Sequence, residues 1–451
     1  MARIRLKSVR FSASYTRVYA VISAWLIAWA AVHMYFERAV FSNDLWWLQY
    51  YVVNYKFGFV RRGLGGELVR IFPDAHYFTA AYAILWTSIG VWLIALAMLT
   101  WLLVSTGTWS ERRIMLALVV PVLPFSFSYA AYSPHPELFG MTALLAFSIS
   151  LTRVRTAPFR MILSALYGIA IAVLALIHEA IPLEFALGAI LAITVLSKDA
   201  TRAAQRSCAV LAVGPGIVSI LMVAALGRHD LAAQLCSQVP HGMVENPWAV
   251  STTPQKGVDY MLGRIESRVD YHDFMCDRVT PIFDADMTGA VQLVAKWGFV
   301  PLFGAFILGL LFFLGTTWMI RYFSGVPVRV FLNELRGNLA LPALGAALLV
   351  PLFVTAVDWT RWWVMVAFDV AIVYVLYAIG RPEIEQPPSR KSVVILACAI
   401  IALAVIPTGA ANNVGGPGSV NSFAWRAVVT RDTPNWCRDL RQMPVSCLRD
   451  A

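Results

Sequence analysis

Long apolar stretches recur along the whole chain, and they constrain the fold more than any other feature. The hydrocarbon core of a bilayer is about 30 Å thick, and a helix of roughly 20 apolar residues crosses it. Of the 451 residues, 59% are hydrophobic and 14% are charged. This composition is typical of a protein dissolved in lipid.

The pattern predicts an all-α polytopic membrane protein with about eleven transmembrane helices. We expect these helices over Arg17 to Tyr35, Phe78 to Leu103, Ile114 to Tyr132, Leu138 to Leu151, Met161 to Ile177, Leu183 to Leu196, Cys208 to Leu226, Val300 to Ile320, Leu339 to Val357, Trp362 to Ile379 and Val393 to Ile406. The chain then divides into an N-terminus (1–16), a bundle (17–406) with long outer loops at 36–77 and 227–297, and an outer tail (407–451).

Lysine and arginine fix the orientation, because cytoplasmic loops accumulate them. The N-terminus is basic, and so are the connectors at 111–113, 152–160, 197–206, 321–337 and 381–391, which the topology puts on one side. The opposite short connectors YSPHPE, HEAIPLE and DWTR contain one arginine between them. The N-terminus is therefore predicted to be cytoplasmic. The net charge of +10 reflects topology, and binding to nucleic acid is not expected.

Four cysteines lie in segments that this topology exports, where disulfides can form. They are Cys236, Cys276, Cys437 and Cys447. Local pairing of Cys236 with Cys276 and of Cys437 with Cys447 is preferred among three connectivities. Four free thiols in a reducing compartment remain the alternative.

The two long outer loops have different patterns. Aromatic and polar residues alternate in NDLWWLQYYVVNYKF, which predicts an interfacial helix with Trp46, Trp47, Tyr50 and Tyr51 at headgroup depth. Residues 257–278 have an amphipathic helical pattern and mixed charge, which predicts a small cap above the bundle.

The segment FVRRGLGGELVRIF places Arg61 and Arg62 before a glycine cluster. Glycines allow close approach of a ligand to the backbone, and a helix that begins near Gly65 would direct free amides outward. Arginine forks suit phosphate. Lipid headgroups at the interface are an alternative partner, and both interpretations require an anion.

Three outer turns carry the other candidate site residues. Asp44, in SNDLWW, is a candidate general base or cation ligand, although capping of the following helix would also explain it. In HEAIPLE, His178 is a candidate proton acceptor or donor, and Glu179 a group that orients it or acts directly. The alternative interpretation is that His178, Glu179 and Glu184 are solvated residues of the turn without a chemical role.

The SPHPE turn presents His135 and Glu137 between stiffening prolines. A divalent cation held by these two residues with Asp44 and Asp358 is conceivable, but the spacing matches no particular metal, so the cofactor is unknown and no metal ligands are predicted.

DWTRWWVMVAFD places Asp358, Arg361 and Asp369 on one helix face. A carboxylate such as Asp369 inside a span should face the bundle interior and find a partner. A structural ion pair with Arg361 is as good an explanation as catalysis.

Together these residues resemble the C-type glycosyltransferase superfamily, bacterial membrane enzymes that use polyprenyl-phosphate sugars. The resemblance rests on Asp44 in the first outer loop, on FGFVRRGLGG and on the HE and DWTR turns. The chain is also similar to Wzy-type polysaccharide polymerases. In the superfamily an acid of the first outer loop serves as base or metal ligand, which by resemblance falls on Asp44. The usual double-acid pattern is missing, which makes His178 and Glu179 rival bases.

The resemblance implies transfer of a sugar from a polyprenyl-phosphate donor to a glycan, lipid or protein acceptor at the periplasmic face of the bacterial inner membrane. Asp44, His178 and Glu179 are the predicted catalytic residues. The predicted substrate-binding residues are Arg61, Arg62, His135, Glu137, Asp358 and Arg361. A Wzy-like polymerase and a lipid-linked glycan transporter are the alternatives.

Overall fold

The computed structural model describes residues 13–40, 42, 44–251 and 253–405. The helices of its first half are α1 (Ala13–Tyr35), α2 (Asp44–Trp47), α3 (Gly63–Arg70), α4 (Tyr77–Ser105), α5 (Glu111–Val119), α6 (Phe127–Tyr132), α7 (Glu137–Arg153), α8 (Ala157–Ala175), α9 (Ile181–Leu196) and α10 (Arg202–Leu226). Those that follow are α11 (Ala232–Cys236), α12 (Pro247–Val250), α13 (Pro254–Met261), α14 (Tyr271–Arg278), α15 (Met287–Trp297), α16 (Phe299–Ser324), α17 (Val328–Asn333), α18 (Ala340–Ala347), α19 (Val350–Thr355), α20 (Trp359–Ile379) and α21 (Lys391–Val405).

Short irregular helices and one strand pair complete the fold. A π-helix, η1 (Phe36–Val40), extends α1. The 3₁₀ helices are η2 (Leu48–Tyr51), η3 (Asp74–His76), η4 (Val120–Val122), η5 (Thr280–Asp284) and η6 (Pro382–Glu385). Strands β1 (Met243–Glu245) and β2 (Arg268–Asp270) pair antiparallel, with Val244 opposite Val269.

The structure confirms an all-α polytopic membrane protein. Seven helical segments of the described residues are long and apolar enough to cross a membrane: Thr16–Val40, Asp74–Ser105, Glu111–Tyr132, Ala157–Ala175, Arg202–Leu226, Phe299–Ser324 and Trp359–Ile379. Three shorter apolar helical segments cover Ile181–Leu196, Ala340–Thr355 and Lys391–Ala404. The remaining predicted span corresponds to α7. All eleven predicted stretches are thus largely helical, but four of them form helices too short to count as spans on length.

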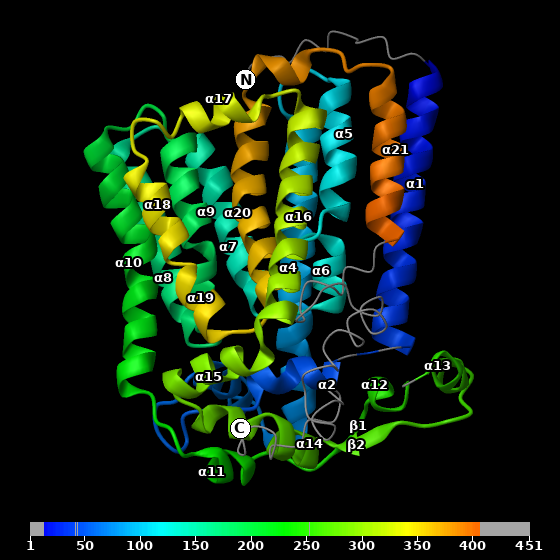
Figure 1. Ribbon diagram of the computed structural model, residues 1–451, viewed down its shortest axis with the longest axis vertical. Helices are drawn as coiled ribbons and strands as arrows, with labels where there is room; N and C mark the ends of the chain where they lie inside the picture. Colours follow the sequence, from blue (N-terminus) through cyan, green and yellow to red (C-terminus); the bar gives the residue numbers. More distant parts are fainter. Residues whose placement is uncertain (1–12, 41, 43, 252, 406–451) are drawn as a thin grey trace.

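The bundle surrounds α20. In its apolar window 83% of the residues are buried, against 11% in that of the first span. A helix that is apolar all round and yet exposed must face lipid. On α1, Val21 and Ile27 are 67% and 71% exposed, which fits that environment. Around α20 pack α7, α9 and α16 (Figure 1).

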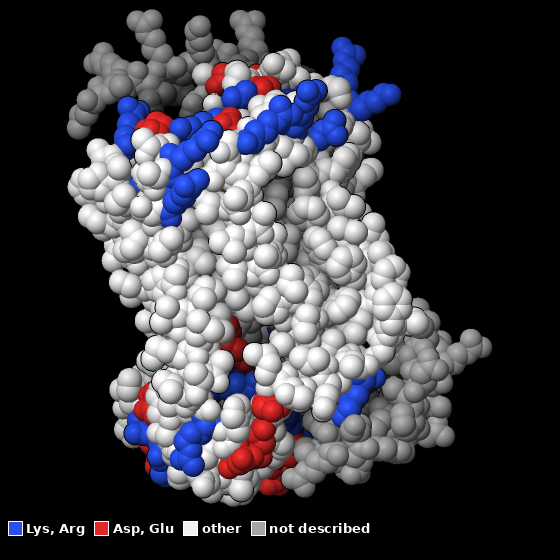
Figure 2. Space-filling model, turned by 60° about the vertical axis from the view of Figure 1, so that its left-hand side comes forward, with Lys and Arg blue, Asp and Glu red and all other residues white. Residues whose placement is uncertain are grey.

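One end of the bundle is rich in lysine and arginine. The basic connectors meet there: Arg112 bonds the carbonyls of Tyr322 and Gln386, and Lys198 pairs with Glu334 at 2.7 Å. Figure 2 shows basic side chains crowded at this upper end, above a broad band without charges. The prediction that these connectors share one side is therefore confirmed.

The two long loops together build one lobe at the opposite end of the bundle. We call residues 44–76 and 228–297 the end lobe. Its own hydrophobic core joins Trp47 and Tyr51 of the first loop to Leu231 and Tyr271 of the second. Helix α14 falls within the predicted cap at 257–278, and α13 overlaps its start.

Three of the four first-loop aromatics that were predicted at headgroup depth are enclosed by protein and do not face lipid headgroups. Trp47, Tyr50 and Tyr51 are at most 4% exposed, and Trp46 alone is 38% exposed. The second loop covers the first, so these rings pack against protein.

A disulfide joins Cys236 and Cys276, with their Cα atoms 5.0 Å apart, as predicted. It ties α11 to α14 across 40 residues of the end lobe. The predicted tail at 407–451, with Cys437 and Cys447, lies outside the described residues.

Candidate functional site

The polar turns singled out from the sequence meet at the junction between the bundle and the end lobe. We divide this polar cluster into a rim (Arg61, Arg62, Glu179 and Asp358) and a floor (His135, Glu137, His178 and Arg361). Rim side chains keep 17–26% of their surface exposed, whereas floor residues are at most 6% exposed. Figure 2 shows a recess between the apolar body and the lower lobe, in which acidic and basic side chains are visible.

Arg62 makes the best-oriented contact of the rim. Its Nε and Nη2 donate to the two oxygens of Glu179, each at 2.9 Å. The Nη1 of Arg61 lies 3.7 Å from Glu179 Oε1, and its Nη2 donates to the Ile282 carbonyl of the end lobe. Burial alone would raise the pKa of Glu179, but Arg62 outweighs burial and holds that pKa well below its usual range.

The backbone at Arg62 is strained. Its φ is +62°, in the left-handed region that residues with a Cβ rarely adopt. Such strain costs of order 1–3 kcal/mol and clusters at functional sites. The turn begins α3 and brings Arg62 over the Tyr50 ring, 5.2 Å from its centroid.

The glycines after Arg62 serve packing, which corrects their predicted role in approaching a ligand. A Cβ on Gly65 would lie 2.1 Å from the Tyr50 carbonyl oxygen, and one on Gly66 would lie 2.2 Å from that of Val53. They therefore let α3 sit directly on the first-loop backbone. The amides of Leu64 and Gly66 already donate to protein carbonyls, so the prediction of free outward amides is also wrong at these positions.

Glu137 is the centre of the floor. Its Oε2 accepts a hydrogen bond from Tyr129, and its Oε1 faces His178 Nε2 at 3.6 Å and Arg361 Nε at 3.7 Å. Arg361 also pairs with Asp358, Nη2 to Oδ2 at 3.0 Å. One guanidinium therefore links the floor to the rim.

The two histidines are neutral and fixed in opposite tautomers. The Ala180 amide donates to His178 Nδ1 at 3.1 Å, so the His178 proton is on Nε2, directed at Glu137. Arg361 Nη1 donates to His135 Nε2 at 2.6 Å, which leaves the His135 proton on Nδ1. Burial lowers the pKa of His178 to about 4 and that of His135 to about 3. The acceptor nitrogen of each ring is therefore already occupied by a donor of the protein, the Ala180 amide for His178 and Arg361 for His135.

Asp358 differs from Glu179 in its electrostatics. Burial raises the pKa of Asp358, because Arg361 offsets the loss of hydration incompletely. Its side chain is 24% exposed. Asp358 and Glu179 are both accessible from the rim, but the pKa is raised for Asp358 and lowered for Glu179.

Asp44, the acid that the family resemblance selects, lies outside the polar cluster. Its carboxylate pairs with Arg38, whose other nitrogen donates to the Ala131 carbonyl at 2.6 Å. The two side chains are 11% and 6% exposed. The π-helical turn after α1 places Arg38 there, and no local sequence pattern predicts this partner.

The conceivable cation site at His135, Glu137, Asp44 and Asp358 does not converge, because Arg38 and Arg361 occupy its ligand atoms. Among the described residues, the groups close enough to hold a metal lie in the end lobe. They are His241 with His272 and Asp273, and His272 with the two disulfide cysteines.

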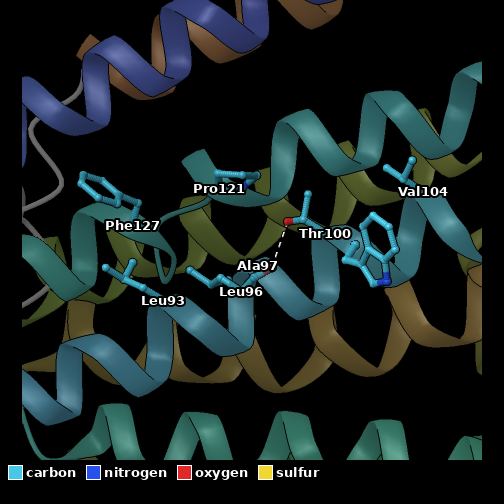
Figure 3. A pocket seen from close by; sticks show the side chains of 8 residues that line it. Leu93, Leu96, Ala97, Thr100, Val104, Pro121 and Phe127 are labelled. Carbon is cyan, nitrogen blue, oxygen red and sulfur yellow. Dashed lines mark hydrogen bonds between the residues drawn. The ribbon is translucent and has the colours of Figure 1, made fainter.

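The bundle also contains an apolar groove of about 450 Å³ between α4 and the segment from η4 to α6. Figure 3 shows its lining, in which the Thr100 hydroxyl bonds its own helix at the Leu96 carbonyl. None of the residues that line the groove belongs to the polar cluster.

Two participants were missed from the sequence. Tyr50 stacks on His178 with ring centroids 5.1 Å apart, and Tyr129 bonds Glu137. Glu184, which the HEAIPLE turn singled out, faces Glu137. Tyr129 is eight residues before Glu137, so its proximity to the SPHPE turn in the sequence could have identified it as a partner. Tyr50 gave no such signal, since it resembles any interfacial aromatic residue.

The family model described as "Uncharacterised membrane protein Rv1490" matches residues 19–404. The chain belongs to this family. Two similar relatives are the uncharacterized proteins Rv1490 of Mycobacterium tuberculosis (strain H37Rv) and Mb1527 of Mycobacterium bovis. Each is 65% identical over 414 residues, covering 92% of this chain and 95% of the relative. No solved structure matches the chain. The family is one of membrane proteins, and its description names no activity.

Proposed function

We propose that this protein transfers a sugar from a polyprenyl-phosphate-type lipid donor to a glycan, lipid or protein acceptor at the periplasmic face of the bacterial inner membrane. The observation that carries the proposal is the accessible arginine–carboxylate rim at the end of the bundle opposite the basic connectors. Cytoplasmic loops are rich in lysine and arginine, so the opposite end faces the periplasm.

Arg61 and Arg62 are the proposed phosphate ligands. Their charge is already balanced in part by Glu179, which holds both donor atoms of the Arg62 fork. A phosphate must therefore displace Glu179 from Arg62. This exchange favours a doubly charged or bidentate anion over a weaker one, because the fork matches phosphate geometry.

Asp358 is the proposed general base. The acceptor oxygen attacks the anomeric carbon, the bond from that carbon to the phosphate oxygen breaks, and the phosphate leaves with the electron pair. The acceptor proton passes to Asp358. The developing negative charge on the phosphate is stabilised by Arg61 and Arg62, an effect of several kcal/mol in a site with little water. Once phosphate has displaced it from Arg62, Glu179 is the second candidate for the general base.

The test uses full-length protein in proteoliposomes with radiolabelled polyprenyl-phosphate and polyprenyl-diphosphate sugars. Label should move to a new acceptor, and replacement of both Arg61 and Arg62 by alanine should abolish this transfer. Arg70→Ala is the matched control, since Arg70 is on α3 but pairs with Glu67 at the surface. Undiminished transfer in the double variant would refute the role of the pair. Transfer from the diphosphate donor alone would favour the Wzy-like polymerase.

A lipid-linked glycan transporter is the second candidate, and one observation favours it. Transporters place ionisable groups inside the membrane. The structure adds Glu184, fully buried on α9, to the buried Asp369 of α20. Label that stays on its carrier and changes leaflet would support transport.

A further inference from the structure

Two carboxyl groups behind the polar cluster have no use in the proposed transfer. Glu184 lies in the first turn of α9 and Asp369 at the middle of α20, and both are fully buried. Ionisable side chains inside a membrane protein are costly, and they are rarely retained without a role.

Neither oxygen of Glu184 accepts a hydrogen bond from any group of the described residues, although Glu137 lies within hydrogen-bonding reach. Two ionised carboxylates are both acceptors and cannot bond to each other. A single proton placed between them supplies the missing donor and removes the repulsion of two like charges.

The surrounding charges do not neutralise Glu184. From α20 it faces Arg361 and Asp369, from α7 it faces Glu137, and the Tyr129 hydroxyl of α6 lies nearby. Arg361 is the cation of this set, and it already pairs with Asp358 and faces Glu137.

Asp369 is the third carboxyl group, and it lies beyond Glu184 in the interior of the bundle. Its Oδ2 accepts a hydrogen bond from the Gly188 amide at 2.8 Å, whereas its Oδ1 has no hydrogen-bond partner in the described part of the chain. A Cβ on Gly188 would lie 2.5 Å from Asp369 Oδ1, so the glycine makes room for this carboxyl group against α9. From α8, Tyr167 faces the same group. The three carboxyl groups thus lead from the floor of the site into the bundle.

We propose that Glu137 and Glu184 bind one proton between them in the resting protein, and that this carboxyl pair, with Asp369 behind it, is a proton-binding site inside the bundle. The proposal does not rest on sugar transfer. His178 directs its Nε2 proton towards Glu137, with Nε2 3.6 Å from Oε1, so the pair has a neighbouring N–H group on the side of the rim.

The test is infrared spectroscopy of the full-length protein in lipid nanodiscs at neutral pH. A protonated carboxylic acid has a carbonyl stretching band that is distinct from the carboxylate bands and shifts in D₂O. Wild type should show such bands, and Glu184→Gln should remove one of them. Glu266→Gln, at an exposed carboxyl group of the end lobe, should leave the spectrum in this region unchanged.

Misfolding is a small concern for Glu184→Gln, because glutamine has the shape of protonated glutamic acid and supplies a donor to Glu137. Its thermal unfolding midpoint should match that of wild type. Asp369→Asn assigns the band of the deeper group. The proposal is overturned if no acid band exists at neutral pH, or if the Glu184→Gln spectrum equals that of wild type. An acid band that appears only after removal of Na⁺ would overturn it too, because the pair would then bind a metal cation.

Discussion

The first outer loop takes part in two arginine–carboxylate pairs that differ in what surrounds them. Arg38 and Asp44 are sealed against α6, with 6% and 11% of their side chains exposed. Arg62 and Glu179 join the loop to the turn between α8 and α9, with 17% and 26% exposed. The first pair is positioned to hold the loop on the bundle. The second can exchange partners with a ligand, so accessibility, more than residue type, marks the candidate site.

The largest expected effect separates the acid of the sealed pair from the acid of the rim. Asp358→Asn should lower the rate of label transfer by about 10²–10⁴, the usual contribution of a general base. Asp44→Asn should leave the rate per folded molecule unchanged. Initial rates, normalised to the monodisperse fraction in gel filtration, check both. A loss in Asp44→Asn equal to that in Asp358→Asn would restore the catalytic role that the family resemblance gives to Asp44.

For stability we expect the opposite order: loss of the Arg38–Asp44 pair should destabilise the protein more than loss of the Arg62–Glu179 pair. Asp44→Ala leaves the Arg38 guanidinium buried without its partner, which should cost about 3–5 kcal/mol of unfolding free energy. Glu179→Ala leaves Arg62 within reach of water and should cost about 1 kcal/mol. Thermal unfolding in the same detergent compares them, and the reverse order would mean that the Arg62 pair is the structural one.

A third expected effect concerns pH. The folded pKa of His178, about 4, lies below its ordinary value of 6.5, so protons bind the unfolded chain first as pH falls. Stability should therefore be highest above about pH 6.5 and decrease towards pH 4, by about 2 kcal/mol at pH 5 for this residue. His135 adds to the loss in the same direction. Below about pH 4.5 the lowered pKa of Glu179 contributes a further decrease.

The measurement is the unfolding midpoint between pH 7.5 and 5 for wild type and two variants. His178→Gln should flatten the decrease, whereas His229→Gln, at an exposed position, should not. A wild-type midpoint that is constant over this range would contradict buried, neutral histidines.

Local patterns in the sequence were enough for several features. Apolar runs specified the helices, the basic connectors specified their common end, and the positions of Cys236 and Cys276 specified a disulfide. The HE, SPHPE and DWTR turns came together as expected, because short connectors between antiparallel helices must lie at the same end of a bundle.

Features that depend on contacts distant in sequence were not predictable. Asp44 has a strong local pattern for capping or catalysis, yet Arg38 and the Ala131 carbonyl decide its environment. The first-loop aromatics match an interfacial belt in composition, but residues 228–297 cover them. Gly65 and Gly66 permit close approach in any context, and the sequence does not say that the approaching group is the protein's own backbone.

Phosphate recognition by the Arg62 fork is the central claim, and direct binding tests it without any assumption about the acceptor. Native mass spectrometry of the full-length protein can measure binding of a polyprenyl phosphate that carries no sugar. Arg62→Ala should weaken binding by about tenfold or more, Arg62→Lys should recover part of it through charge alone, and Arg70→Ala should match wild type. Equal binding by wild type and Arg62→Ala would contradict the account.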